Sequence, residues 1–188
     1  MRASKEMTKQ VARQLTGFQK ESHAESLASG IIRRCNNDPE LQGKIEKANS
    51  VVSAVMGRGV TSFFAAEYAK VFTKPEQAMA TRERIMAEME VQHGLTPKHS
   101  AKMADCVVFA AAKKSDLNAV EALSRMVSAA LGSGAAFDVV ADAVYYAPTD
   151  VTPADLARRI VATSLKKNKP MDVSEIALSH DLASSLSA

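Results

Sequence analysis

The sequence contains no tryptophan, and phenylalanine and tyrosine bring the aromatic share to only 5%. Clusters of aromatic and β-branched residues are typical of strands, so their scarcity argues against a β-sheet domain. The apolar share of 46% is nevertheless ordinary for a globular protein. The core must therefore be built from alanine, valine, leucine, isoleucine and methionine. Because alanine is the strongest helix former, this composition predicts an all-α protein.

Features of secreted and membrane proteins are also scarce. The only two cysteines, Cys35 and Cys106, stand on separate predicted helices, which favours reduced thiols in a cytosolic compartment over a disulfide framework. The longest apolar run, residues 106–112, is too short to cross a bilayer. Residues 1–15 lack the apolar stretch of a secretory signal. We therefore expect a cytoplasmic protein without a transmembrane segment.

The first residues of several helices can be predicted from this sequence. Thr96 and Thr152 are each followed by proline, which is well tolerated at the first position of a helix. Similar reasoning predicts five N-caps, at Asp38, Thr73, Thr96, Thr152 and Asp172. We predict a compact bundle of about ten short helices. Their ranges are 3–19, 21–35, 39–57, 61–72, 75–93, 97–114, 116–131, 135–147, 153–167 and 173–186.

Apolar spacing indicates which helix faces are buried. The 39–57 helix carries apolar residues three or four positions apart: Leu41, Ile45, Ala48, Val52 and Val55. Residues 106–112 are apolar on every side, so the helix near 97–114 is predicted to lie at the centre of the bundle. We assign residues 1–150 to one helical domain and residues 151–188 to a C-terminal helical pair packed on the same domain.

The first predicted helix is amphipathic, and its polar face is basic. The cations that share this face are Arg2, Lys5, Lys9, Arg13 and Lys20, which we call the first basic cluster. Such a face is either a solvated surface or a contact for phosphates, anionic lipid or an acidic partner.

A second basic cluster closes the 153–167 helix and consists of Arg158, Arg159, Lys166, Lys167 and Lys169. Cations at a helix C-terminus complement the helix dipole, which is a purely structural role. If the two clusters meet in space, they form one positive face. The net charge of +3 is too small to decide between these interpretations.

The segment after the second basic cluster resembles the start of a helix-turn-helix. Its matching residues are Ser174, Glu175, Ile176 and Ala177. Asp181 stands where that motif has its turn glycine. The alternative is a short amphipathic helix that docks through Ile176, Leu178, Leu182 and Leu186.

Candidates for catalysis are few. Asp138 and Asp142 are four residues apart on one helix and share a face, so the pair can hold a metal or divide acid and base roles. Asp105 stands in the most apolar helix, where a buried carboxylate needs a partner. His93 and His99 are near each other, but two nitrogens do not make a zinc site. We therefore predict no metal site and no cofactor.

The predicted 75–93 helix carries a stripe of flexible apolar side chains, rich in methionine. This stripe either packs in the core or forms a surface for a protein partner. Its residues are Met79, Ile85, Met86 and Met89.

These observations favour a non-catalytic helical protein-interaction protein, an adaptor, accessory or regulatory scaffold that binds a protein partner or self-associates. The first alternative is a nucleic-acid-binding regulator that uses the two basic clusters, with an affinity that falls steeply with salt. The second is a small hydrolase-like enzyme in which Asp105, Asp138 or Asp142 lies in a cleft near His93 or His99.

Overall fold

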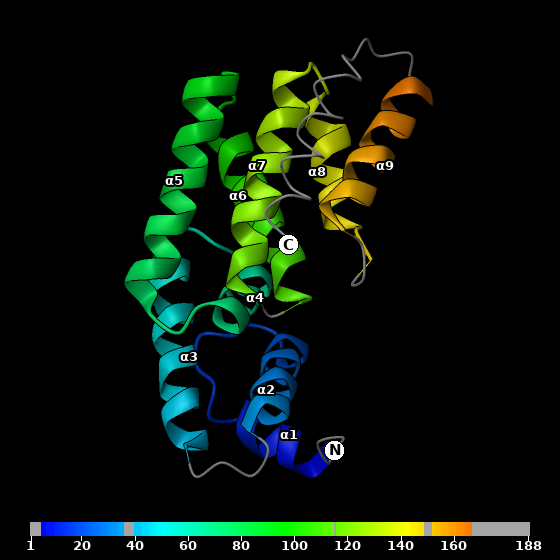
Figure 1. Ribbon diagram of the computed structural model, residues 1–188. Helices are drawn as coiled ribbons and strands as arrows, with labels where there is room; N and C mark the ends of the chain where they lie inside the picture. Colours follow the sequence, from blue (N-terminus) through cyan, green and yellow to red (C-terminus); the bar gives the residue numbers. More distant parts are fainter. Residues whose placement is uncertain (1–4, 36–39, 115, 149–151, 167–188) are drawn as a thin grey trace. The chain divides into compact units, whose positions relative to one another are not determined.

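The computed structural model describes residues 5–35, 40–114, 116–148 and 152–166. These residues form nine α-helices and no strand, which confirms the predicted all-α fold (Figure 1). The chain divides into two units, Met1–Thr81 and Arg82–Ala188. The boundary between them falls inside α5 (Pro75–His93), where the sequence contains no helix-breaking residue. No helix among the described residues is both long and apolar enough to span a membrane.

The first unit contains α1 (Lys5–Ala12), α2 (Glu21–Cys35), α3 (Leu41–Met56) and α4 (Ser62–Val71). Helix α4 packs against both α2 and α3, and α1 packs against α2. The predicted apolar face of α3 is buried at four of its five positions, and Leu41 is half-buried. The largest fully buried side chains of this unit are those of Leu27, Ile45, Tyr68 and Phe72.

The prediction that the first helix spans 3–19 is wrong, because α1 ends at Ala12. Asn49 of α3 accepts a hydrogen bond from the backbone N–H of Thr16 at 3.0 Å and donates one to the carbonyl of Gln14 at 3.0 Å. Two backbone groups that would continue the helix are thus bound by another helix. Gly17 follows with φ +86°, a left-handed conformation that glycine adopts without strain.

The second unit contains α6 (Pro97–Ala112), α7 (Leu117–Gly132), α8 (Phe137–Tyr145) and α9 (Pro153–Lys166), with the remainder of α5. These four helices lie side by side (Figure 1). Helices α7 and α8 each contact α6, and each of them also contacts α9. Residues 106–112 are buried except for the half-buried Phe109. This burial agrees with the prediction, which was based on the apolar residues that surround this part of the helix on every side.

Two predicted N-caps are confirmed, at Thr96 and Thr152, whereas the N-cap predicted at Thr73 is wrong, because α5 begins at Pro75 and the residue that flanks it is Lys74. The Thr96 hydroxyl accepts a hydrogen bond from the N–H of His99 at 3.3 Å. Thr152 and Asp155 bond each other reciprocally, since each backbone N–H donates to the other's side chain. Asp38, Asp172 and the predicted 173–186 helix lie outside the described residues. So does the predicted domain boundary after residue 150, which stays a prediction.

Candidate functional site

The first basic cluster is not one helix face. Lys5 and Lys9 lie on α1, whereas Arg13 and Lys20 follow its end, and Arg2 is outside the described residues. Lys5, Arg13 and Lys20 are exposed and Lys9 is half-buried. The early end of α1 therefore removes the helical geometry that joined these cations.

The second basic cluster is described only in part. Arg158 and Arg159 are exposed on α9, and Arg158 is 2.8 Å from the carboxylate of Asp155. Lys167 and Lys169 lie outside the described residues, and Lys166 is the last residue of α9. The first cluster belongs to the first unit and the second to the other, so a shared positive face stays a prediction.

The three candidate carboxylates occupy two kinds of environment, one buried and one exposed. Asp105 is buried, and its Oδ1 accepts a hydrogen bond from Nε of Arg82 at 3.0 Å, so its expected burial and need of a partner are confirmed. Asp138 and Asp142 are exposed on α8. Among the described residues, no group of three or more His, Cys, Asp or Glu side chains is arranged to hold a metal ion.

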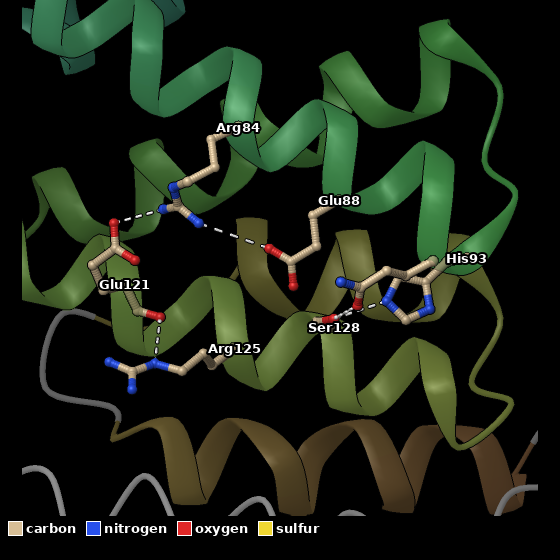
Figure 2. Close-up of polar contacts among 7 residues, drawn as sticks. Arg84, Glu88, His93, Glu121, Arg125 and Ser128 are labelled. Atoms are coloured by element: carbon tan, nitrogen blue, oxygen red, sulfur yellow. Dashed lines mark hydrogen bonds and ion pairs between the residues drawn. The ribbon is translucent and has the colours of Figure 1, made fainter.

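A polar seam joins α5 to α7 within the second unit (Figure 2). Arg84 bonds the carboxylate of Glu121 at 2.6 Å and lies 3.8 Å from that of Glu88. At the other end of the seam, Nε2 of His93 and the hydroxyl of Ser128 are 2.8 Å apart. Burial lowers the pKa of His93, and the nearby charge of Glu88 opposes this shift only in part. His93 is therefore mostly neutral near pH 7.

A serine bonded to a neutral histidine is also the core of a nucleophilic dyad. In such sites a third group holds the second ring nitrogen and orients the base. Within the described part of the chain, no hydrogen bond between a carboxylate and His93 is found, and Glu88 is paired with Arg84 instead. His99 stacks on Phe137 with the ring centroids 4.3 Å apart. We interpret the His93–Ser128 bond as a link between two helices.

The first unit contains a cavity of about 230 Å³ between α2, α3 and α4, which we call the basic pocket. Its apolar lining residues are Ile31, Ala48, Ala69 and Phe72. Its polar lining residues are Arg34, Lys44, Lys47 and Thr73. Three cations thus surround an apolar floor, and the described lining contains no aspartate or glutamate.

Arg34 is held in place by the ends of two helices. Its Nε donates to the carbonyl of Gly30 on its own helix at 3.3 Å, and a terminal nitrogen donates to the carbonyl of Lys70 near the end of α4. The guanidinium lies over Gly30, where an added Cβ would meet it at 3.6 Å. Burial lowers the pKa of Arg34, but a guanidinium stays charged at any physiological pH. Arg34 is exposed, so the pocket presents a cation that is open to solvent and oriented by its two hydrogen bonds.

This chain matches no family model, no curated protein and no solved structure. Its function has to be inferred from its own residues.

Sequence reasoning missed the three cations of the basic pocket. Lys44 and Lys47 are three residues apart on α3 and flank the apolar face that contains Ile45 and Ala48, which is a signal the sequence does carry. Their approach to Arg34 depends on the packing of three helices, which no local pattern specifies. The pocket therefore becomes visible only in the structure.

The apolar stripe of α5 is divided between core and surface. Ile85 and Met89 are completely buried, so these two side chains are not available to a partner. Met79 and Met86 are half-buried. A partner-facing role stays a prediction for these two methionines.

A second cavity, of about 370 Å³, lies in the second unit beside the turn between α6 and α7. Its polar lining includes Lys114, Asp116 and Asn118. The Asp116 carboxylate already accepts a hydrogen bond from the N–H of Asn118 at 2.9 Å and caps α7. Because its charges are mixed and one is engaged in capping, this cavity favours no particular ligand class.

Proposed function

We propose that this chain is a non-catalytic helical protein-interaction protein, and that its first unit binds an acidic surface of a partner protein. The observation that supports this is the basic pocket, where Arg34, Lys44 and Lys47 surround an apolar floor. Complementary charge steers association and selects the partner, while burial of apolar surface supplies affinity. The pocket combines positive charge and apolar surface on one face of the unit.

The chemistry of the pocket favours a protein over a nucleic acid. Proteins that bind single strands combine cations with exposed aromatic rings on which bases stack. The only aromatic residue among the described lining residues is Phe72, which is 2% exposed and packs against Tyr68 with the ring centroids 6.0 Å apart. Phe72 therefore contributes to the floor only through the small part of its surface that is exposed, which is too little for a base to stack on. Carboxylates beside apolar groups suit the pocket better.

The test uses a short fluorescent peptide rich in aspartate and serine and a fluorescent DNA duplex of similar length. Fluorescence anisotropy measures binding of each to the full chain over a range of salt concentrations. We expect the acidic peptide to bind, with an affinity that decreases as salt is added. Tighter binding of the DNA would instead support the nucleic-acid-binding alternative.

A matched pair of variants locates the binding surface. Lys47→Glu reverses a charge of the pocket, and Lys5→Glu makes the same change on α1, at another exposed position of the unit. We expect Lys47→Glu to weaken binding of the acidic peptide about tenfold, as reversal of a close charge pair does. Lys5→Glu should change it little. The opposite ranking, or no binding by the unaltered chain, would overturn the proposal.

A further inference from the structure

We infer that the basic pocket binds a partner segment in which one large apolar side chain is flanked by carboxylates. This inference rests on the proposed function, because it specifies the partner chemistry of the same pocket. The apolar side chain would occupy the floor between α2, α3 and α4. The carboxylates beside it would meet Arg34 and Lys47 at the rim.

The size of the pocket supports a single side chain as the occupant. Sites for drug-sized molecules usually measure about 300 to 1,000 Å³. At about 230 Å³ the basic pocket is smaller, and its volume suits one large side chain. Protein interfaces commonly concentrate their affinity in such an anchor, surrounded by contacts that exclude water.

The arrangement of charge supports carboxylates beside the anchor. Arg34 is fixed by its bonds to the carbonyls of Gly30 and Lys70, so little side-chain freedom remains to be lost when a ligand binds. Its remaining N–H groups are oriented donors, for which a carboxylate is the preferred planar acceptor. Lys47 is exposed on the neighbouring helix α3 and supplies a second, adaptable charge. The long lysine stems add to the apolar lining.

The absence of tryptophan from the chain allows a direct experiment. The probe is a short acidic peptide with one central tryptophan, so that its indole emission is observed without interference from the protein. A second peptide replaces the tryptophan with serine, and a third keeps the tryptophan but replaces each acidic residue with lysine. Each carries the same fluorescein label for anisotropy.

We expect the tryptophan peptide to bind about tenfold more tightly than the serine peptide, since burial of a large apolar side chain contributes roughly this much. Its indole emission should shift to shorter wavelength on binding. The lysine peptide should not bind. Filling the pocket with Ala48→Leu should remove the tenfold advantage of tryptophan and leave binding of the serine peptide unchanged, with circular dichroism and urea unfolding used to verify the fold.

The outcomes separate this inference from the proposed function. If both acidic peptides bind equally and the indole emission does not shift, the inferred apolar anchor is wrong, but the proposed binding of an acidic partner is retained. If neither acidic peptide binds, the proposed function fails. If indole-3-acetate alone binds as tightly as the tryptophan peptide, the pocket is a site for a small carboxylate and the inference is overturned. For Ala48→Leu, an unchanged tenfold advantage in a folded variant also contradicts it.

Discussion

Nε of Arg82 on α5 donates a hydrogen bond to Oδ1 of Asp105 on α6 at 3.0 Å, and their side chains are only 9% and 11% exposed. This pair explains how a carboxylate is accommodated in the most apolar helix of the chain. A buried ion pair is not strongly stabilising by itself, because dehydrating both charges opposes their attraction. Removing Asp105 is different, since it takes one counter-charge away from the buried guanidinium of Arg82.

Replacing Asp105 with alanine should therefore lower the free energy of unfolding by about 3 kcal/mol. Urea unfolding followed by circular dichroism measures this change. The control is the double variant Arg82→Met with Asp105→Leu, in which both charges are replaced by apolar groups of similar size. It should regain most of the lost stability. A single variant as stable as the unaltered chain would contradict the burial of this pair.

A pH dependence follows from His93, whose pKa is lowered by burial from its ordinary value of 6.5. Above this value the histidine is neutral in both the folded and the unfolded chain. Below it, the unfolded chain binds the proton first, so stability decreases as the pH falls from 6.5 toward the lowered pKa of the folded state. The midpoint of urea unfolding should therefore decrease between about pH 7 and about pH 5.

Two comparisons isolate the contribution of His93. His93→Gln keeps a side chain that can bond Ser128 but does not titrate. The midpoint of urea unfolding of this variant should therefore change less between about pH 7 and about pH 5. Asp155 titrates in a different pH range, because its hydrogen bonds to Thr152 lower its pKa from 3.8. The stability that Asp155 contributes is therefore lost only as the pH falls below that value. Identical pH profiles for the unaltered chain and the His93 variant would refute the assignment.

The two thiols should be unreactive in the folded protein. Cys35 and Cys106 are buried, and burial raises the pKa of Cys106 to about 11. Since the thiolate is the reactive form, very little of Cys106 can react with a disulfide reagent at about pH 8. In Cys35→Ala, where Cys106 is the remaining thiol, we expect slow labelling in buffer and rapid labelling in urea. Rapid labelling in buffer would mean that α6 opens readily.

Local information in the sequence accounts for most helix boundaries, because N-caps, prolines and glycines act within one turn. The prediction for α5, 75–93, coincides with the helix observed, and Thr96 and Thr152 start α6 and α9 as expected. The partner of Asp105 could not be named from the sequence, because Arg82 is 23 residues away. The basic pocket was hidden for the same reason, since its cations meet only when α2, α3 and α4 pack.

The end of α1 is the boundary where local rules failed, and Asn49 is the residue that accounts for the failure. Its side chain bonds the carbonyl of Gln14 and the N–H of Thr16 from a helix 33 residues farther along the chain. Both backbone groups would lose their partner in Asn49→Ala. Two net hydrogen bonds contribute about 2 kcal/mol, and the better helix propensity of alanine offsets part of this loss. We therefore expect a destabilisation of about 1 kcal/mol.

The neighbouring variant Ser50→Ala provides a matched control for this prediction. The Ser50 hydroxyl bonds only the carbonyl of Glu46 among the described residues, within its own helix, so its loss should have almost no effect on unfolding. Hydrogen exchange adds a local measurement, because the amide of Thr16 should exchange faster in Asn49→Ala and at an unchanged rate in Ser50→Ala. If the Thr16 amide stays equally protected in both variants, another interaction ends α1, and residues 13–17 are held to α3 without Asn49.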